Sequence, residues 1–187
     1  MKRLTDEQLA AKLQEGDHEA FGLIIDKYES AIVRYANRLV NDHDIAEDVA
    51  QEAFIKTYRD IQSFDTKRKF SSWLYRIAHN EAIDYIRKNK RIVGLDEAIE
   101  VASEIDLHKT AQKNLDKSGT KDKLEKAINK ISSKYREAVI LRFYEEKEYE
   151  EIAEILHVPI GTVGTYISRA KKELKEQLSD INIEDYL

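Results

Sequence analysis

The sequence predicts an all-α protein built from two small helical domains joined by a flexible linker. Helix breakers are scarce, because the 187 residues include only one Pro and six Gly. Apolar residues recur at steps of three, four and seven over most of the chain, which is the spacing of amphipathic helices. Residues 92–121 lack this spacing and mix charged with small polar residues, as linkers do. We therefore expect domains at residues 1–91 and 122–187.

Four helices are expected in the first domain. A short helix covers about residues 6–14 and ends at Gly16, and Asp17 then caps a long second helix. The third helix, about 44–61, follows a turn at residues 41–43, and the fourth opens at Ser71 or Ser72 and reaches about Lys90. The second helix carries its buried stripe on Phe21, Ile24, Ile25, Tyr28, Ile32, Tyr35, Ala36 and Leu39. The small inner residues of the third helix, which permit close helix contact, are Ala46, Val49, Ala50 and Ala53.

Helical spacing returns after the linker, from Asp122 onward, and Ser132 is expected to cap a helix boundary. The last part, residues 149–178, predicts a helix-turn-helix with Pro159 at the turn. Its inward-facing residues are Ile152, Leu156, Val163, Ile167 and Ala170, with the small Ala153 where the two helices cross. Its outer face carries residue types that reach phosphates and base edges, namely Thr162, Thr165, Ser168, Arg169 and Lys172. An ordinary helical hairpin with a solvated polar face is the alternative.

Charge is unevenly distributed along the chain, although the net charge is only -5. Residues 42–52 carry five acids and no base, whereas residues 53–93 carry ten bases and four acids. A protein that turns a basic face to one partner and an acidic face to another has this pattern. The negative total therefore does not exclude nucleic-acid binding.

The fourth helix and the loop before it are a candidate surface for single-stranded nucleic acid. Aromatic rings stack on unpaired bases, and cations contact the backbone. The candidate residues are Phe64, Lys69, Trp73, Arg76, Asn80 and Arg87. The alternative is that the rings of Phe64, Phe70 and Trp73 belong to the core.

The third helix carries one polar stripe opposite its small residues. The stripe consists of Asp44, Glu47, Asp48, Gln51 and Glu52. Three interpretations of this stripe are open: a docking face for a basic partner, a carboxylate metal site, or a solvated helix face. The chain has no Cys and no His-Glu-x-x-His motif, and its five His lack metal-ligand spacing, so we expect no metal, no cofactor and no catalytic residues.

Several segments together resemble the extracytoplasmic-function (ECF) group of bacterial sigma factors. "AFGLIIDKY" is similar to the opening of that family's domain two, "AEDVAQEAFIKTY" to its polymerase-binding segment and "FSSWLYRIAHNEAIDYIRK" to its minus-ten segment. "YREAVILRF", "YEEIAEIL" and "PIGTVGTYISRAKKEL" are similar to its domain four. The resemblance covers nearly the whole chain apart from the linker.

The resemblance implies a promoter-specificity subunit of bacterial RNA polymerase. The polar stripe from Asp44 to Glu52 would dock on the clamp coiled coil of the largest subunit, and domain four on the flap of the second-largest subunit. The loop 64–69 and the face bearing Trp73, Arg76 and Asn80 would hold the minus-ten strand. Arg169, with Thr165 and Ser168, would read the minus-thirty-five duplex. Many members are held inactive by an anti-sigma protein, so the resemblance raises the same question for this chain.

The chain departs from the family pattern at three places. Gly164 and Tyr166 stand where basic residues are common, which predicts fewer phosphate contacts at the minus-thirty-five element. Gly164 also suggests a softer helix or close approach to a backbone. Ser132 lies where a Leu-Pro pair is common.

Two other functions compete with the sigma-factor prediction. One is a stand-alone helix-turn-helix regulator, and the other is a helical interaction module or carboxylate metal enzyme that uses the stripe on the third helix. The sequence has no run of about 18 apolar residues and no signal peptide, so we expect a cytoplasmic protein without direct membrane insertion.

Overall fold

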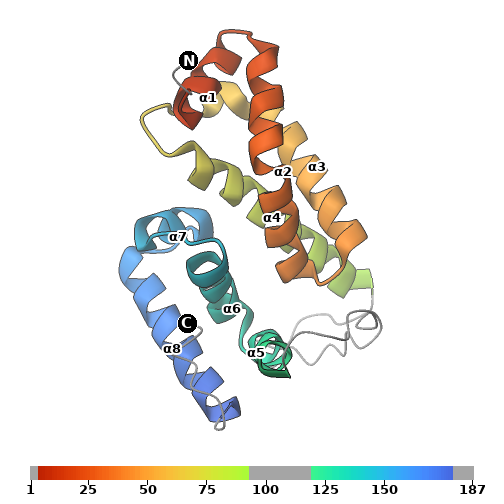
Figure 1. The fold of residues 1–187 in the computed structure, drawn as a ribbon, viewed down its shortest axis with the longest axis vertical. Helices are drawn as coiled ribbons and strands as arrows, with labels where there is room; N and C mark the ends of the chain where they lie inside the picture. Colours follow the sequence, from red (N-terminus) through yellow and green to blue (C-terminus); the bar gives the residue numbers. More distant parts are fainter. Residues whose placement is uncertain (1–3, 93–118, 179–187) are drawn as a thin grey trace. The chain divides into compact units, whose positions relative to one another are not determined.

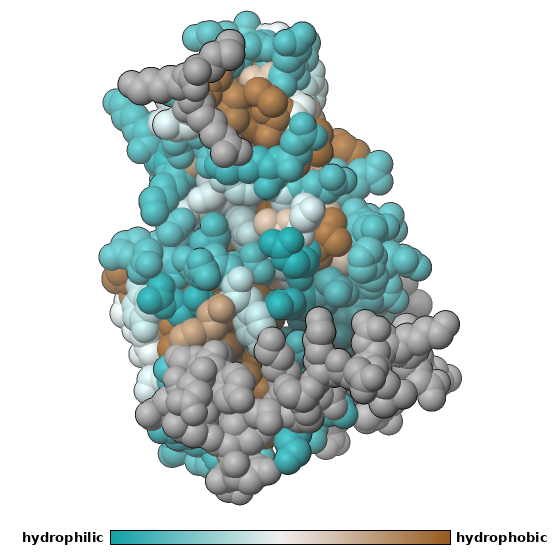
Figure 2. All heavy atoms as spheres, in the orientation of Figure 1, coloured by the Kyte–Doolittle hydropathy of each residue, from teal (hydrophilic) through white to brown (hydrophobic). Residues whose placement is uncertain are grey.

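The computed structural model describes residues 4–92 and 119–178, with side chains over 4–89 and 123–178. These parts of the chain contain helices and no strand, and the chain divides into two compact units. Figure 1 shows α1 to α4 in the first unit and α5 to α8 in the second. None of the described helices is long and apolar enough to cross a membrane. The face in Figure 2 is mostly hydrophilic, with scattered hydrophobic patches.

The helix bounds of the first unit follow the predicted ones closely. They are α1 (Asp6–Gln14), α2 (His18–Val40), α3 (His43–Asp60), the short 3-10 turn η1 (Ile61–Ser63) and α4 (Phe70–Ile92). Gly16, at φ 95°, ends α1, and the Asp17 carboxylate caps α2 by accepting from the Glu19 and Ala20 N–H groups. Asn41 adopts the left-handed conformation, and Asp42 caps α3. Short polar side chains thus separate the helices as expected.

The core of the first unit forms between α2, α3 and α4. Ile24, Ile32 and Tyr35 of α2 are fully buried, while Phe21 and Ile25 at the edge of the predicted stripe are only partly buried. The predicted small stripe of α3 is buried throughout, so these helices approach closely. Leu74, Ala78 and Ala82 supply the inner face of α4.

A buried histidine connects two helices of this core. His79 of α4 is 8% exposed, and its Nδ1 shares a 2.9 Å hydrogen bond with the hydroxyl of Tyr35 on α2. Burial lowers the pKa of His79 to about 4, because the charged ring would lose its hydration.

This histidine predicts acid sensitivity of the first unit. The unfolded chain takes up a proton as the pH falls through 6.5, while folded His79 stays neutral until about pH 4. The free energy of unfolding should therefore fall by about 3 kcal/mol between pH 7 and pH 4 from this group. Urea unfolding of the wild type and His79→Gln at both pH values measures it. Equal losses in the two proteins would contradict the prediction.

The second unit begins at α5 (Gly119–Lys130), three residues before the predicted boundary at Asp122. It continues with α6 (Ser133–Val139), the π-helical turn η2 (Ile140–Tyr144), α7 (Tyr149–Leu156) and α8 (Ile160–Gln177). Residues 93–118, most of the predicted linker, lie outside the described residues. The domain limits at 91 and 122 stay a prediction. One core cluster joins α5, α6 and α8, and it consists of Leu124, Ala127, Ile128, Ile131, Tyr135, Val139, Ala170, Leu174 and Leu178.

The boundary at Ser132 differs from its predicted cap. Ser132 occupies the N-cap position of α6, but its hydroxyl makes no capping hydrogen bond. Its backbone carbonyl accepts from the N–H groups of Tyr135 and Arg136 instead. Backbone geometry therefore starts this helix, and the Ser side chain does not.

Candidate nucleic-acid interface

The helix-turn-helix is present in the second unit. His157 adopts a left-handed φ of 54° after α7, and Pro159 is the N-cap residue of α8, with its carbonyl 2.8 Å from the Thr162 N–H group. Ile152 is buried as predicted. The inward residue predicted at Leu156 is wrong by one position, because Ile155 is 1% exposed and Leu156 is only half-buried. The predicted crossing residue Ala153 is half-buried.

Helix α8 divides into the two faces that the sequence predicts. Val163, Ile167 and Ala170 are buried at 0, 4 and 0% exposure. On the other face Thr165, Ser168, Arg169 and Lys172 are exposed, and Thr162 is half-buried. We call these five residues the recognition face.

Two members of the recognition face are held in place. The Thr165 hydroxyl donates to the Gly161 carbonyl at 3.1 Å, and Arg169 donates from Nη1 to the hydroxyl of Tyr135 at 3.1 Å. That bond also raises the pKa of Arg169 above its usual value. Since Tyr135 belongs to the core, the core holds one terminal nitrogen of the guanidinium group, and Arg169 as a whole is exposed.

The two departures in α8 have different structural explanations. Tyr166 packs its ring 5.6 Å from that of Tyr135, centroid to centroid, against the core cluster. The position thus serves packing in this chain. A Cβ added at Gly164 would lie 3.7 Å from a carbon of the Tyr149 ring, an ordinary contact, so no close approach to a backbone explains the glycine.

A further basic surface, which sequence reasoning missed, adjoins the recognition face. Arg142, Lys171 and Lys175 line a shallow pocket together with Phe143 and Ser168. The Lys171 ammonium lies 5.0 Å from the centre of the Phe143 ring. The spacing of Ser168, Lys171, Lys172 and Lys175 on one helix was the available signal.

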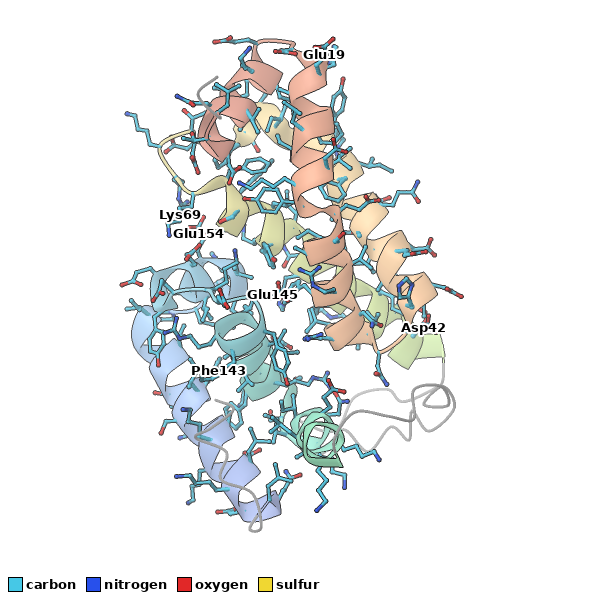
Figure 3. All side chains as sticks on the ribbon, viewed as in Figure 1. Glu19, Asp42, Lys69, Phe143, Glu145 and Glu154 are labelled. Carbon is cyan, nitrogen blue, oxygen red and sulfur yellow. The ribbon has the colours of Figure 1, made fainter. Side chains whose placement is uncertain are left out.

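The polar stripe of α3 is an exposed acidic surface. All five members, Asp44, Glu47, Asp48, Gln51 and Glu52, are exposed. The opposite side of the same helix is buried. We call this stripe the acidic surface. Figure 3 places Asp42, at the start of α3, far from Lys69, which precedes α4. The acidic surface and the basic loop therefore begin at separate places on the first unit.

An apolar groove adjoins the acidic surface. It lies between α2 and α3, and its apolar lining residues are Phe21, Ile25, Phe54, Ile55 and Tyr58. Polar and charged residues, among them Arg34, Glu47 and Gln51, line it as well. Ile55 is 51% exposed and Tyr58 42% exposed, which is unusual for large apolar side chains gathered in one place. Acidic and apolar residues thus form one continuous surface.

The metal alternative has a limited geometric basis. The ligand atoms of His43, Asp44 and Glu47 lie within 4.8 Å of one another, all on exposed side chains. His43 and Glu47 form an ion pair at 3.5 Å when the imidazole is protonated. Exposed acidic groups commonly lie this close without an ion.

The candidate single-strand surface on α4 is partly corrected by the structure. Lys69, Asn80 and Arg87 are exposed, and Arg76 is half-buried. Phe64 and Trp73 are only 5% and 7% exposed. Their ring centroids lie 5.1 Å apart, and both rings pack on the fully buried Phe70. The alternative that these rings belong to the core is correct, so Phe64 and Trp73 do not present free faces to bases.

The loop before α4 is an ordered basic turn. The Asp65 carboxylate accepts from the Lys67 N–H group at 3.0 Å, and the Asp65 carbonyl accepts from the Arg68 N–H group at 2.9 Å. Lys67, Arg68 and Lys69 are exposed. The turn therefore carries three consecutive cations at the surface.

Comparisons with known proteins give consistent matches. Residues 24–92 match the family model Sigma-70 region 2, and residues 121–174 match Sigma-70, region 4. The ECF RNA polymerase sigma factor SigW of Bacillus subtilis is 39% identical over 180 residues, which cover 91% of this chain and 95% of that protein. The ECF RNA polymerase sigma-E factor of Haemophilus influenzae is 33% identical, over 96% of this chain and 98% of that protein.

Solved structures agree with this fold. The sigma factor RpoE from Bartonella quintana, solved in complex with the anti-sigma factor NepR, is 30% identical, with a TM-score of 0.66 over 85% of this chain and 96% of that chain. CnrH, solved in complex with the cytosolic domain of CnrY, shares the fold with a TM-score of 0.69 at 21% identity, over 95% of this chain and 99% of that chain.

A helical unit with an exposed acidic surface and a basic turn, and a second unit with a helix-turn-helix, are the parts of a promoter-recognition protein. The chain belongs to the sigma-70 family, as one of its ECF RNA polymerase sigma factors.

Proposed function

We propose that the two units divide the work of a sigma factor, the first binding polymerase and the unpaired promoter strand and the second reading duplex DNA. As an ECF family member, the protein is an RNA polymerase sigma factor that directs core RNA polymerase to promoters. Sigma factors are in general non-catalytic specificity subunits, and we assign no catalytic residue to this chain. The core enzyme works in the cytoplasm, which is where we place the protein.

The acidic surface is the proposed docking site for the clamp coiled coil of the largest polymerase subunit. The carrying observation is that all five members are exposed on a helix whose other face is buried. Carboxylates attract a basic partner, and the adjoining apolar groove adds area that favours association once it is covered. An anti-sigma protein that covers this same surface would compete with polymerase. The flap of the second-largest subunit is the proposed partner of the second unit.

The 64–69 loop and α4 are the proposed minus-ten surface. Lys69, Arg76 and Arg87 supply cations for the strand, and Asn80 supplies an amide that can donate and accept. The buried rings of Phe64 and Trp73 support this surface from beneath. Because both rings are buried, we assign them no base stacking.

The recognition face of α8 is the proposed reader of the minus-thirty-five duplex. Arg169 offers an exposed guanidinium held by the Tyr135 hydroxyl, Thr165 and Ser168 offer hydroxyls, and Lys172 is the last member of this face along the helix. Arginine reads guanine edges with paired N–H groups, and lysine contacts phosphates as a point charge. The basic side chains of the adjoining pocket would add contacts to the DNA phosphate backbone, and they are Arg142, Lys171 and Lys175.

Arg169 and Lys172 should respond differently to replacement by alanine. We expect Arg169→Ala to weaken holoenzyme binding to its selected promoters by roughly 5- to 150-fold and to relax preference at one base pair. Lys172→Ala should weaken all sequences alike and reduce the salt dependence by about one phosphate contact. Binding is measured against duplexes selected by the wild-type holoenzyme from a random-sequence pool.

Core binding and thermal melting of both variants serve as controls. Arg169→Ala also removes the bond to the Tyr135 hydroxyl, so Tyr135→Phe, which removes that bond alone, separates the two effects. Unchanged promoter preference in folded Arg169→Ala would contradict base reading by this residue.

A further inference from the structure

Helix α1 holds the start of the 64–69 loop through one side chain. The Gln14 amide Nε2 donates to the carbonyl oxygens of Ile61 and Phe64, each at 2.8 Å. The Gln62 amide in turn donates to the Gln14 carbonyl at 2.8 Å. These three hydrogen bonds connect the last residue of α1 to η1, the turn from which the loop leaves.

The same helix also contacts the end of the loop. The Glu7 carboxylate accepts from the Phe70 N–H group at 3.2 Å, and Phe70 is the first residue of α4. A negative charge at a helix start is favourable, because the N–H groups there lack partners within the helix. Asp6 anchors α1 itself to α2, since its carboxylate accepts from Lys27 at 2.5 Å and from Tyr28 at 2.6 Å.

The loop is thus tied at both ends by α1 and within by Asp65. Fixed ends restrict the backbone of the turn, and with it the positions from which Lys67, Arg68 and Lys69 project. A surface already held in its binding shape avoids the entropic cost of ordering when the ligand arrives.

We propose that α1 positions the 64–69 loop for capture of the minus-ten strand and that Gln14 is the principal positioning residue. The inference rests on the proposed function of the loop. Helix α1 ends at Gln14, before the region 2 match begins at residue 24, so the matched segment does not include this support.

The test removes the two hydrogen bonds that the Gln14 amide donates and changes the side chain little otherwise. Gln14→Met keeps the length of the side chain and removes the amide, while Glu15→Met is the matched control at the neighbouring exposed position. Each variant is assembled with core RNA polymerase and transcribes promoters selected by the wild-type holoenzyme from a random-sequence pool. We expect Gln14→Met to lower transcript yield about tenfold, since two ordinary hydrogen bonds together have about that effect. Core binding stays unchanged, and Glu15→Met behaves as the wild type.

Trp73 provides a signature that overall destabilisation would not produce. It is the only Trp in the chain, and its ring centroid lies 5.1 Å from that of Phe64, whose carbonyl accepts from Gln14. Release of Phe64 should shift the fluorescence emission of the folded protein, well below its melting temperature. Glu15→Met should leave the emission unchanged.

A loop variant separates failure of this inference from failure of the proposed function. If Lys67→Ala with Lys69→Ala leaves transcription unchanged, the loop does not hold the strand, and both ideas fall. If the loop variant loses transcription while folded Gln14→Met keeps wild-type yield and emission, only the role of α1 is overturned. Should Gln14→Met not fold, Gln62→Ala, which removes only the reciprocal bond, must lower the yield by a smaller factor, and wild-type yield there overturns the inference.

Discussion

Asp48→Arg is expected to abolish binding to core RNA polymerase while leaving the fold intact. Asp48 is exposed on α3 in the middle of the acidic surface, where five acceptors have no base among them. A cation there would face a basic partner, and like-charge contacts across an interface cost enough to weaken binding by about 100-fold or more. Titration of labelled core enzyme with the purified protein near physiological salt measures the loss.

The matched control for Asp48→Arg is Asp26→Arg, the same charge change at an exposed position of α2 outside the acidic surface. It should bind core polymerase as the wild type does. Both variants should show wild-type circular dichroism and melting, because neither side chain is buried. If Asp48→Arg binds as tightly as Asp26→Arg, the acidic surface is not the docking site for core polymerase.

Trp73→Ala should have the largest effect on stability, because the indole is 7% exposed and packs on two rings. Removal of a buried aromatic side chain of this size costs about 3–5 kcal/mol. For a unit of this size, that loss lowers the melting temperature by more than about 10 °C. Thermal melting followed by circular dichroism measures it without relying on the lost fluorophore.

Trp73→Phe distinguishes core packing from base stacking at this position. A phenyl ring keeps much of the contact with Phe64 and Phe70, so we expect a smaller loss of stability and nearly normal transcription. If Trp73→Ala melted as the wild type does but failed in promoter opening, the indole would act on DNA, and its assignment to the core would be wrong.

Local signals predicted most of the helices in this protein. Gly16, Asp17 and Asn41 mark helix ends by conformational and capping preferences that operate within a few residues. The two-faced pattern of α8 was equally local, since Val163, Ile167 and Ala170 recur at helical spacing. The resemblance of the sequence motifs to sigma factors is confirmed by the family matches over residues 24–92 and 121–174.

Errors arose where one residue's environment depends on distant parts of the chain. Phe64 and Trp73 have residue types that suit both a core and a stacking surface, and only packing against Phe70 distinguishes the two. Tyr166 likewise stands where a basic residue is common in the family, and the structure shows that its ring packs on Tyr135. Leu156 and Ile155 both fit the helical period after Ile152, and only the packing shows that Ile155 is the buried one.

The sequence by itself determined the all-α class, the helix ends and the residues of the acidic surface and the recognition face, because helical period and capping are encoded by near neighbours. Only the tertiary structure decided that the loop before α4 is tied to α1. Gln14 and Phe64 are 50 positions apart, and Glu7 and Phe70 are 63 apart. No local pattern reports such hydrogen bonds, since they form only after the core has brought the helices together.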